Sequence, residues 1–291
     1  MMETTILPRP RELRCRDRRL VTGEYTLIMG IVNVTPDSFS GDGLDGQIDA
    51  AIAQAQQMVA DGADIIDIGG ESTRPGAVPV TADEERHRVV PVIAHLRSTV
   101  SVPLSIDTRK PEVAVAALDA GAHIVNDVTG LLRSAPMAEV VAEIGAAVIA
   151  MHSPGEPWDI TWPAHYEDVI SEVKSSLQQS IAIAAAAGVA DDQIVIDPGF
   201  GFGKGLQDNL TILRRVGEFR SLGVPVLLGT SRKSTIGRIL GLPVEDRLEG
   251  SLATIPLAIV QGVDILRVHD VRSSVRVARM ADAVVRGYAG S

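Results

Sequence analysis

The segment PVLLGTSRKSTIG, residues 225–237, carries cations and hydroxyl groups between an apolar run and a helix start. PVLLG is typical of a short strand, and KSTIGRIL is typical of a helix opening, with Ser231 as its expected N-cap. Cations, hydroxyls and free backbone N–H groups would converge at the end of the strand, where they can hold a carboxylate, a phosphate or an electron-rich ring oxygen. Taken alone, the segment is more typical of a solvated helix start, because capped starts are commoner than anion sites.

Polar side chains follow the other apolar runs of the chain in the same way. They are Asn33, the segment GGESTRPG at 69–76, Asp107, Asn126 with Asp127, His152, Asp197 and the segment RVHD at 267–270. If the runs are parallel strands whose carboxyl ends meet at one face, these side chains meet there too. A barrel with a purely structural role gives no reason for carboxylates, amides and cations to gather at one mouth. The pattern therefore predicts a functional site.

The glycine-rich segment GFGFGKG does not match the common nucleotide-binding patterns. Pro198 stands where a phosphate loop needs its first glycine, Gly205 stands where Ser or Thr should follow the lysine, and the GxGxxG spacing is absent. The glycines instead indicate a close approach of the backbone to a flat ligand, with Phe202 as a stacking or packing face. Scattered histidines and a single cysteine give no support to a zinc site.

Eight short apolar runs alternate with longer helical patterns along the chain. The runs cover residues 26–33, 64–69, 103–107, 123–127, 146–152, 193–197, 225–229 and 264–268. Several helical patterns end at a glycine of C-cap type, namely Gly62, Gly121 and Gly188. The runs are apolar throughout, as expected of strands that are covered on both faces. Eight such units without a linker predict one α/β domain, a (β/α)8 TIM barrel over residues 26–291. A doubly wound open sheet is the alternative, which periodicity does not exclude.

The N-terminal residues 1–25 are expected to form a short β segment, because RELRCRDRRLVTG alternates like the polar face of a strand pair. The formal net charge of -10 over 291 residues argues against a nucleic-acid or anionic membrane surface. Cys15 is the only cysteine, so no intrachain disulfide is possible. The N-terminus has no apolar stretch of signal-peptide type, and no run is long enough to span a membrane. We expect a soluble, cytoplasmic protein.

Eight segments of the chain together resemble the dihydropteroate synthase family. They are MGIVNVTPDSFS, DIGGESTRPGA, SIDTRKPEVA, IVNDVTG, DPGFGFGK, LLGTSRKSTIGR, DRLEGSLA and RVHDV, in order between Met29 and Val271. The resemblance implies a (β/α)8 barrel, usually a homodimer, that condenses 6-hydroxymethyl-7,8-dihydropterin pyrophosphate with para-aminobenzoate and releases pyrophosphate. It also implies Mg²⁺ as the cofactor and inhibition by sulfonamides. The expected partners are these small molecules.

The residue chemistry agrees with such a reaction. Asp107, Asn126 and Asp197 suit the donor and acceptor edge of a pterin, and Lys233 suits its ring carbonyl or N5 region. The resemblance gives a further set of positions for the diphosphate, with Asn33 as the metal ligand. They are Asn33, Arg267 and His269. We expect substantial C–O cleavage before the amine attacks the pterin methylene.

The aminobenzoate carboxylate fits the helix start at Ser234. By the same resemblance, Thr73, Arg74, Pro75 and Phe202 would shape the slot around its ring. The first loop would close over the reactants and carries further expected site residues. They are Asp37, Ser38 and Asp42.

Two loops depart from the family pattern. The first loop reads SFSGDG where the family usually reads SFSDGG, so Gly41 replaces the expected aspartate and Asp42 is displaced by one position. The fifth loop, MHSPGEPWDITWP, keeps only its Met-His start. An alternative is therefore a paralogue that retains part of the ligand site with little or no synthase activity, because lid residues tolerate little misplacement. A pterin-dependent methyltransferase is a further alternative, which SRKS and RVHD disfavour.

Overall fold

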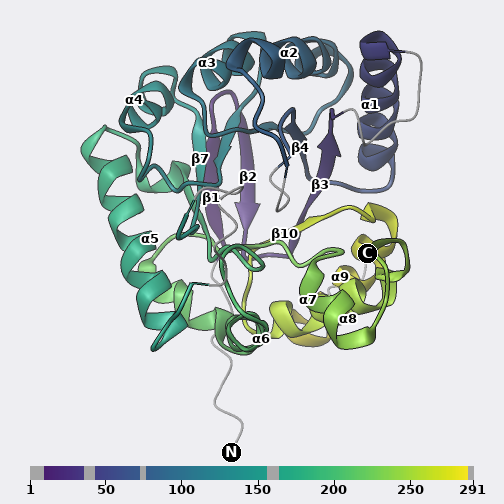
Figure 1. Cartoon of the computed structure of the whole chain (residues 1–291), viewed down its shortest axis with the longest axis vertical. Helices are drawn as coiled ribbons and strands as arrows, with labels where there is room; N and C mark the ends of the chain where they lie inside the picture. Colours follow the sequence, from purple (N-terminus) through teal and green to yellow (C-terminus); the bar gives the residue numbers. More distant parts are fainter. Residues whose placement is uncertain (1–9, 36–42, 73–76, 156–163, 288–291) are drawn as a thin grey trace, which may run out of the picture.

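Eight parallel strands form a closed barrel in the computed structural model, which describes residues 10–35, 43–72, 77–155 and 164–287 (Figure 1). The strands are β3 (Leu27–Asn33), β4 (Ile65–Gly69), β5 (Leu104–Asp107), β6 (Ile124–Asp127), β7 (Ala147–Met151), β8 (Ile194–Asp197), β9 (Leu227–Leu228) and β10 (Ile265–Val268). They pair in the order β8-β7-β6-β5-β4-β3-β10-β9. A parallel bridge between Ile196 and Val226 joins the two ends of this sheet, and the Ile196 N–H donates to the Pro225 carbonyl at 3.0 Å. The predicted barrel is thus confirmed, and the alternative open sheet is wrong.

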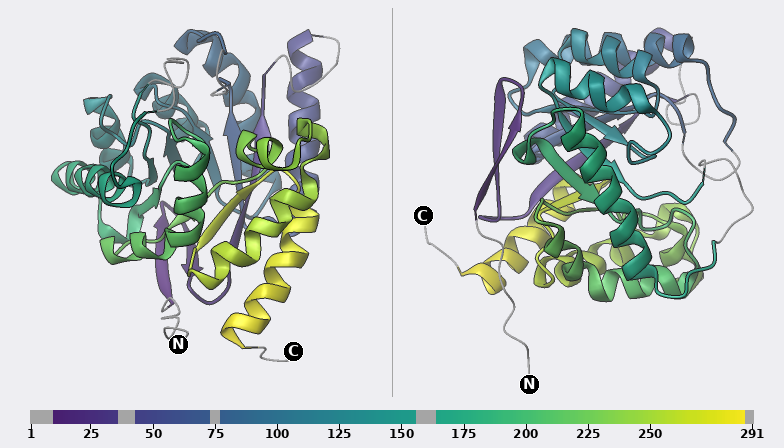
Figure 2. Two further views of the ribbon diagram at one scale, coloured as in Figure 1. Left: turned by 60° about the horizontal axis from the view of Figure 1, so that its bottom comes forward. Right: turned by 90° about the vertical axis from the view of Figure 1, so that its left-hand side faces the viewer.

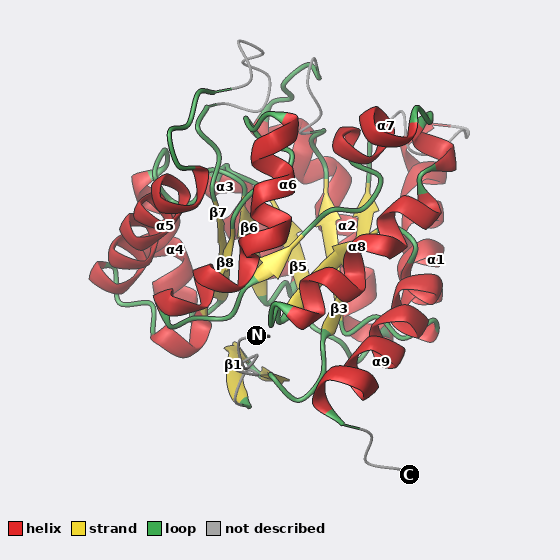
Figure 3. Ribbon diagram, turned by 90° about the horizontal axis from the view of Figure 1, so that it is seen from below, coloured by secondary structure: helices red, strands yellow, loops and turns green. Residues whose placement is uncertain are grey.

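Helices surround the barrel, one or more after each strand (Figure 3). They are α1 (Gly43–Ala60), α2 (Ala82–Thr99), α3 (Pro111–Ala120), α4 (Ala135–Ile144), α5 (Val169–Ala186), α6 (Leu206–Arg215), α7 (Ser234–Leu240), α8 (Leu248–Val260) and α9 (Val271–Arg286), with 3-10 turns η1 (Asp191–Gln193), η2 (Val216–Leu222) and η3 (Val244–Asp246). Local sequence explains several ends. Thr81 caps α2 by accepting from the Glu84 N–H at 3.2 Å. The predicted glycine ends are confirmed, since Gly62, Gly121 and Gly188 all have positive φ.

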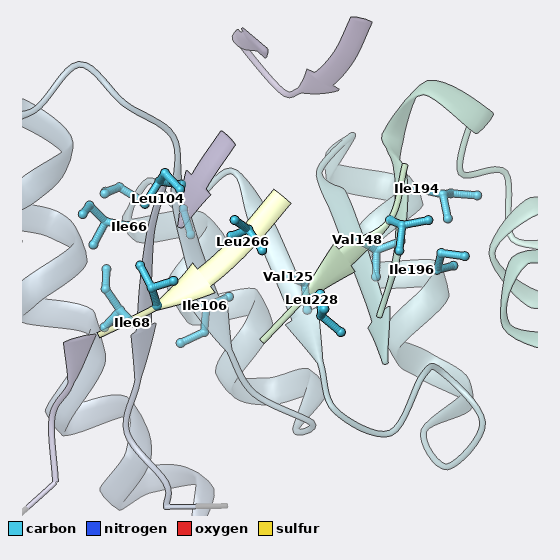
Figure 4. Close-up of a cluster of buried hydrophobic side chains, with 14 of the residues drawn as sticks. Ile66, Ile68, Leu104, Ile106, Val125, Val148, Ile194, Ile196, Leu228 and Leu266 are labelled. Carbon is cyan, nitrogen blue, oxygen red and sulfur yellow. The ribbon is translucent and has the colours of Figure 1, made fainter. Parts of the chain in front are cut away.

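Side chains of each strand alternate between the helices and the barrel interior. The outward set packs against the helices and is apolar: Ile66, Ile68, Leu104, Ile106, Val125, Val148, Ile194, Ile196, Leu228 and Leu266 (Figure 4). The inward set is apolar near the amino ends of the strands: Met29, Ile65, Ile124, Ile149, Val195, Leu227 and Ile265. Near the carboxyl ends the inward set becomes polar: Asn33, Asp67, Asp107, Asn126, Asp197 and Arg267. One end of the interior is therefore core, and the other end can carry chemistry.

An antiparallel hairpin covers the core end of the barrel (Figure 2). It consists of β1 (Arg11–Cys15) and β2 (Arg18–Thr22), as the alternation of the N-terminal sequence predicts. Leu13 and Cys15 are buried among the inward apolar residues, so the hairpin completes that core. Burial raises the pKa of the Cys15 thiol to about 12, which leaves it protonated and unreactive at neutral pH. No helix in the described ranges is long and apolar enough to cross a membrane.

Candidate active site

Arg267 lies at the centre of the polar end of the interior. Its Nε donates to Asp67 Oδ2 at 2.6 Å, and one of its terminal nitrogens donates to Asp107 Oδ2 at 2.6 Å. The Asn126 amide donates to the same Asp67 oxygen at 3.2 Å. One guanidinium thus joins side chains from β4, β5 and β10. Of the predicted site residues, this group brings Asp107, Asn126 and Arg267 together.

Asp67 belongs to the site but was missed by the sequence analysis. It lies within β4, its side chain is fully buried, and its Oδ1 makes no hydrogen bond to any described residue. A buried carboxylate with an unsatisfied oxygen is costly unless the site uses it. A signal was present in the sequence, because an aspartate interrupts the apolar run IIDIG at an inward position. Because the prediction considered only the residues at the ends of strands, it did not include Asp67.

Burial raises the pKa values of the two carboxyls at the strand ends. The pKa of Asp107 rises to about 7, because burial and the neighbouring Asp67 charge outweigh the opposing effect of Arg267. The pKa of Asp197 is also raised by burial, and Lys233 and the Gly199 N–H oppose that rise. The Gly199 N–H donates to Asp197 Oδ1 at 2.7 Å. Both carboxyls therefore sit where a ligand's hydrogen-bond donors would favour the ionised form.

Lys233 faces the turn between β8 and α6. Its ammonium donates to the Phe200 carbonyl and lies 4.3 Å from the centre of the Phe202 ring. Burial lowers the pKa of Lys233 to about 8, and Asp197 limits that fall. The predicted neighbours Lys233, Asp197 and Phe202 are thus gathered on one side of the strand ends.

The expected N-cap at Ser231 is wrong. The helix α7 begins at Ser234, the residue in the N-cap position is Lys233, and no described side chain caps it. The chain first passes through Arg232, whose φ of 57° is left-handed, so the helix cannot start there. The Ser231 hydroxyl instead accepts from the His269 N–H at 3.2 Å and lies 3.0 Å from His269 Nδ1.

Two side-chain contacts join the loop after β9 to the loop after β10. Besides the Ser231–His269 pair, Arg232 forms a bidentate ion pair with Asp270 at 3.0 and 2.5 Å. His269 is therefore held two residues from Arg267, beside the start of α7. Ser234 is exposed at the first residue of that helix.

Asn33 stands at the end of β3, half-buried, beside the Gly69 backbone and Asp107. A Cβ placed on Gly69 would lie 3.6 Å from Asn33 Oδ1 and 3.5 Å from the Asp107 Cβ, so the glycine keeps this space open. In the described part of the chain, no three His, Cys, Asp or Glu side chains are grouped to hold a metal. Mg²⁺ usually takes one or two protein oxygens together with substrate phosphates and water. The Asn33 amide oxygen fits that partial role.

Other predicted site residues fall outside the described residues. They are Thr73, Arg74 and Pro75 in the second loop, and Asp37, Ser38 and Asp42 in the first loop. Gly41, which stands in place of the expected aspartate of the first loop, is also outside. Their roles stay predictions.

Comparisons with known proteins agree with this geometry. Residues 29–269 match the family model described as pterin binding enzyme. The chain is 48% identical over 262 residues to a dihydropteroate synthase of Bacillus subtilis, which covers 90% of both chains. Two solved structures are also similar to it. The Xanthomonas albilineans dihydropteroate synthase with 4-aminobenzoic acid has a TM-score of 0.89 and 44% identity, covering 95% of this chain and 98% of that one. The Yersinia pestis enzyme in a sulfonamide complex has a TM-score of 0.89 and 39% identity, covering 96% and 100%.

Proposed function

The chain belongs to the dihydropteroate synthase family of pterin-binding enzymes. On that basis we propose which of its residues bind each substrate and which stabilise the leaving group. It is a transferase that condenses 6-hydroxymethyl-7,8-dihydropterin pyrophosphate with para-aminobenzoate, releasing pyrophosphate. The main support for this assignment of roles is the buried Asp67–Arg267–Asp107 group at the carboxyl ends of the strands. It offers fixed hydrogen-bond partners at the polar end of the barrel interior.

The pterin is recognised by the inward groups of β5, β6 and β8. Ionised Asp107 and Asp197 accept from the amino and ring N–H groups of the pterin edge, and the Asn126 amide offers both a donor and an acceptor. Lys233 donates to the ring carbonyl or N5 region. The raised pKa of Asp107, about 7, supports this role, because donors of the bound pterin stabilise the charge that burial disfavours.

The diphosphate is held at the mouth by Arg267, His269 and Asn33. Arg267 remains paired with carboxylates, which keeps the guanidinium fixed in orientation. The Asn33 amide oxygen would hold Mg²⁺ together with the substrate phosphates, and the ion would supply positive charge to the leaving group. Arg267 and His269 stabilise the departing pyrophosphate. The pterin nitrogens delocalise the positive charge that develops on the methylene carbon. The aminobenzoate amine then attacks that carbon, and no enzyme nucleophile is needed.

The aminobenzoate ring lies against Phe202, with its carboxylate near the Ser234 hydroxyl. The half-buried Phe202 ring beside the Lys233 ammonium supports this position. Thr73, Arg74 and Pro75 complete the slot by resemblance. A sulfonamide would compete for the same place, as the sulfonamide complex of the Yersinia pestis relative suggests.

The test is dihydropteroate formation by the purified chain with both substrates and magnesium, beside an active family member. We expect turnover comparable to that control. Turnover at background level from folded protein would favour the weakly active paralogue, which the sequence SFSGDG motivates. The double substitution Gly41→Asp with Asp42→Gly would then restore turnover if the displaced aspartate is the cause. Omission of magnesium with added chelator is expected to lower the rate.

We also propose that the chain forms a homodimer through its α7–α9 face. Helix α8 lies between α7 and α9 (Figure 3). Large apolar side chains of these helices and of the turn after α7 are exposed. They are Ile239, Leu240, Leu242, Leu257, Val260, Met280 and Val284. Val284 is 73% exposed and Met280 67%, and large exposed apolar side chains gathered on neighbouring helices are typical of an interface. A cytoplasmic location is a further proposal, consistent with the single buried cysteine.

A dimer of this kind predicts a clear result for Val284→Glu. The new charge would be buried against the partner, so the sedimenting mass is expected to fall from that of a dimer to that of a monomer at micromolar concentration. Val78→Glu, on a residue 82% exposed and outside this face, is the control and should leave the mass unchanged. A monomeric wild-type protein would disprove the proposal.

A further inference from the structure

Lys204 is a buried lysine that the reaction described above does not use. Its ammonium lies 2.8 Å from the Phe202 carbonyl, 2.9 Å from the Gly199 carbonyl and 2.9 Å from His152 Nδ1. The residue as a whole is 7% exposed. Burial lowers the pKa of Lys204 well below its usual value, and Asp197 opposes that fall. In the protonated form, these three acceptors satisfy all three hydrogens of the ammonium. The side chain therefore links the end of β7 to the turn that follows β8.

That turn is one that needs external support. Gly199, Gly201 and Gly203 all have positive φ, so the backbone between Asp197 and Lys204 is rich in freely rotating residues. Gly199 also approaches the neighbouring loop closely, because a Cβ there would lie 1.9 Å from the His152 carbonyl. The Lys204 ammonium folds back onto the two carbonyls of this same turn. It reduces the conformational freedom that the glycines would otherwise leave.

His152 fixes the other end of this link. Its backbone N–H donates to the backbone carbonyl of Asp197 at 2.9 Å, which joins His152 to the end of β8. Burial and the Lys204 charge lower the pKa of His152 to about 3, so the ring is neutral at neutral pH. With Nδ1 accepting from Lys204, the ring hydrogen is on Nε2.

The turn presents two groups to the site on its opposite side. One is the Phe202 ring, and the other is the Phe200 carbonyl that receives the Lys233 ammonium. Movement of the turn would displace both of them. Asp197 lies on strand β8, and its carboxylate also accepts from the Gly199 N–H at the start of the turn, at 2.7 Å.

We propose that Lys204, anchored on His152, is a positioning residue that sets the aminobenzoate slot through the turn at 199–203. The proposal rests on the function proposed above, because it concerns the Phe202 side of that site. It makes Lys204 a determinant of aminobenzoate and sulfonamide affinity without contact to either molecule.

The test compares Lys204→Met with Lys174→Met, a matched substitution on α5 away from the site. Loss of the three bonds is expected to raise the KM for para-aminobenzoate and the Ki of a sulfonamide by about tenfold, the effect of one or two net hydrogen bonds. The KM for the pterin pyrophosphate should rise by less, about threefold at most, because Asp107 and Asn126 are held by Arg267 and Asp67, which lie outside the turn. Equal changes in both KM values, or no change in either, would overturn the proposal.

His152→Phe provides a second variant if Lys204→Met does not fold. It removes one of the three acceptors, so a smaller rise in the aminobenzoate KM is expected. The double variant should be no worse than Lys204→Met alone, since the two residues act through one contact. Additive losses would contradict a shared role.

Nitrogen NMR of His152 separates this proposal from the proposed function. In the wild type, Nδ1 should give the resonance of a hydrogen-bond acceptor, and in Lys204→Met it should move towards that of an unbonded neutral imidazole. An unchanged resonance would refute the contact itself. If the wild type makes no dihydropteroate, the proposed function fails instead, and calorimetry with para-aminobenzoate would still show weaker binding to Lys204→Met if the positioning role holds.

Discussion

Arg267→Met is expected to lower kcat/KM for the pterin pyrophosphate by at least about 100-fold and the free energy of unfolding by about 3 kcal/mol. Arg267 is the common partner of Asp67 and Asp107, at 2.6 Å from each. Those side chains are 0% and 9% exposed, so removal of the guanidinium leaves two adjacent buried carboxyls without a cation to neutralise them. Urea unfolding at pH 7.5 and steady-state kinetics would measure the two effects.

Two further variants distinguish the structural part of this effect from the catalytic part. Arg272→Met, on the exposed start of α9, is the control and should change neither quantity. Neutralising both carboxylates in the background of Arg267→Met, as Asp67→Asn with Asp107→Asn, should recover much of the lost stability because no unpaired charge remains. It should not recover turnover, because the groups for the pterin and the leaving group are gone. Full activity of Arg267→Met would exclude the arrangement of roles proposed here.

The second large effect concerns pH. Asp107 must be ionised to accept from the pterin, and Lys233 must be protonated to donate to it. The pKa of Asp107 is raised to about 7, so kcat/KM for the pterin pyrophosphate should increase as the pH rises through 7. The pKa of Lys233 is lowered to about 8, so kcat/KM should fall as the pH rises through 8. We expect a narrow, bell-shaped profile with its maximum between these two values.

Variants of Asp107 and Lys233 test which residue causes each limb of that profile. Asp107→Asn is expected to lose at least about 100-fold in kcat/KM and to lack the acid limb, because an amide does not titrate. Lys233→Arg should move the alkaline limb upwards by more than two units, since guanidinium stays charged. Titration of the substrates is common to all three enzymes, so only the differences between their profiles count. An alkaline limb unmoved in Lys233→Arg would remove Lys233 from the assignment.

The sequence by itself determined the elements and their order. Apolar runs of five to eight residues predicted all eight barrel strands, including β9, which the structure reduces to Leu227–Leu228. Local chemistry fixed the glycine ends of helices at Gly62, Gly121 and Gly188, because only the adjacent backbone decides a left-handed conformation. Motifs at the strand ends predicted Asp107, Asn126 and Arg267 as neighbours, since parallel strands in a barrel end at the same face.

Only the tertiary structure decided which side chains meet across the barrel. Asp67 was not predicted because it lies within an apolar run and not at its end. Closure of the barrel decides which positions of that run face inward. Ser231 was expected to cap a helix, a local role, but it pairs with His269, which is 38 residues away. The Lys204–His152 contact spans 52 residues and has no local signature at all. Pairing between residues that are distant in sequence depends on strand register and on the path of the loops, which spacing along the chain does not encode.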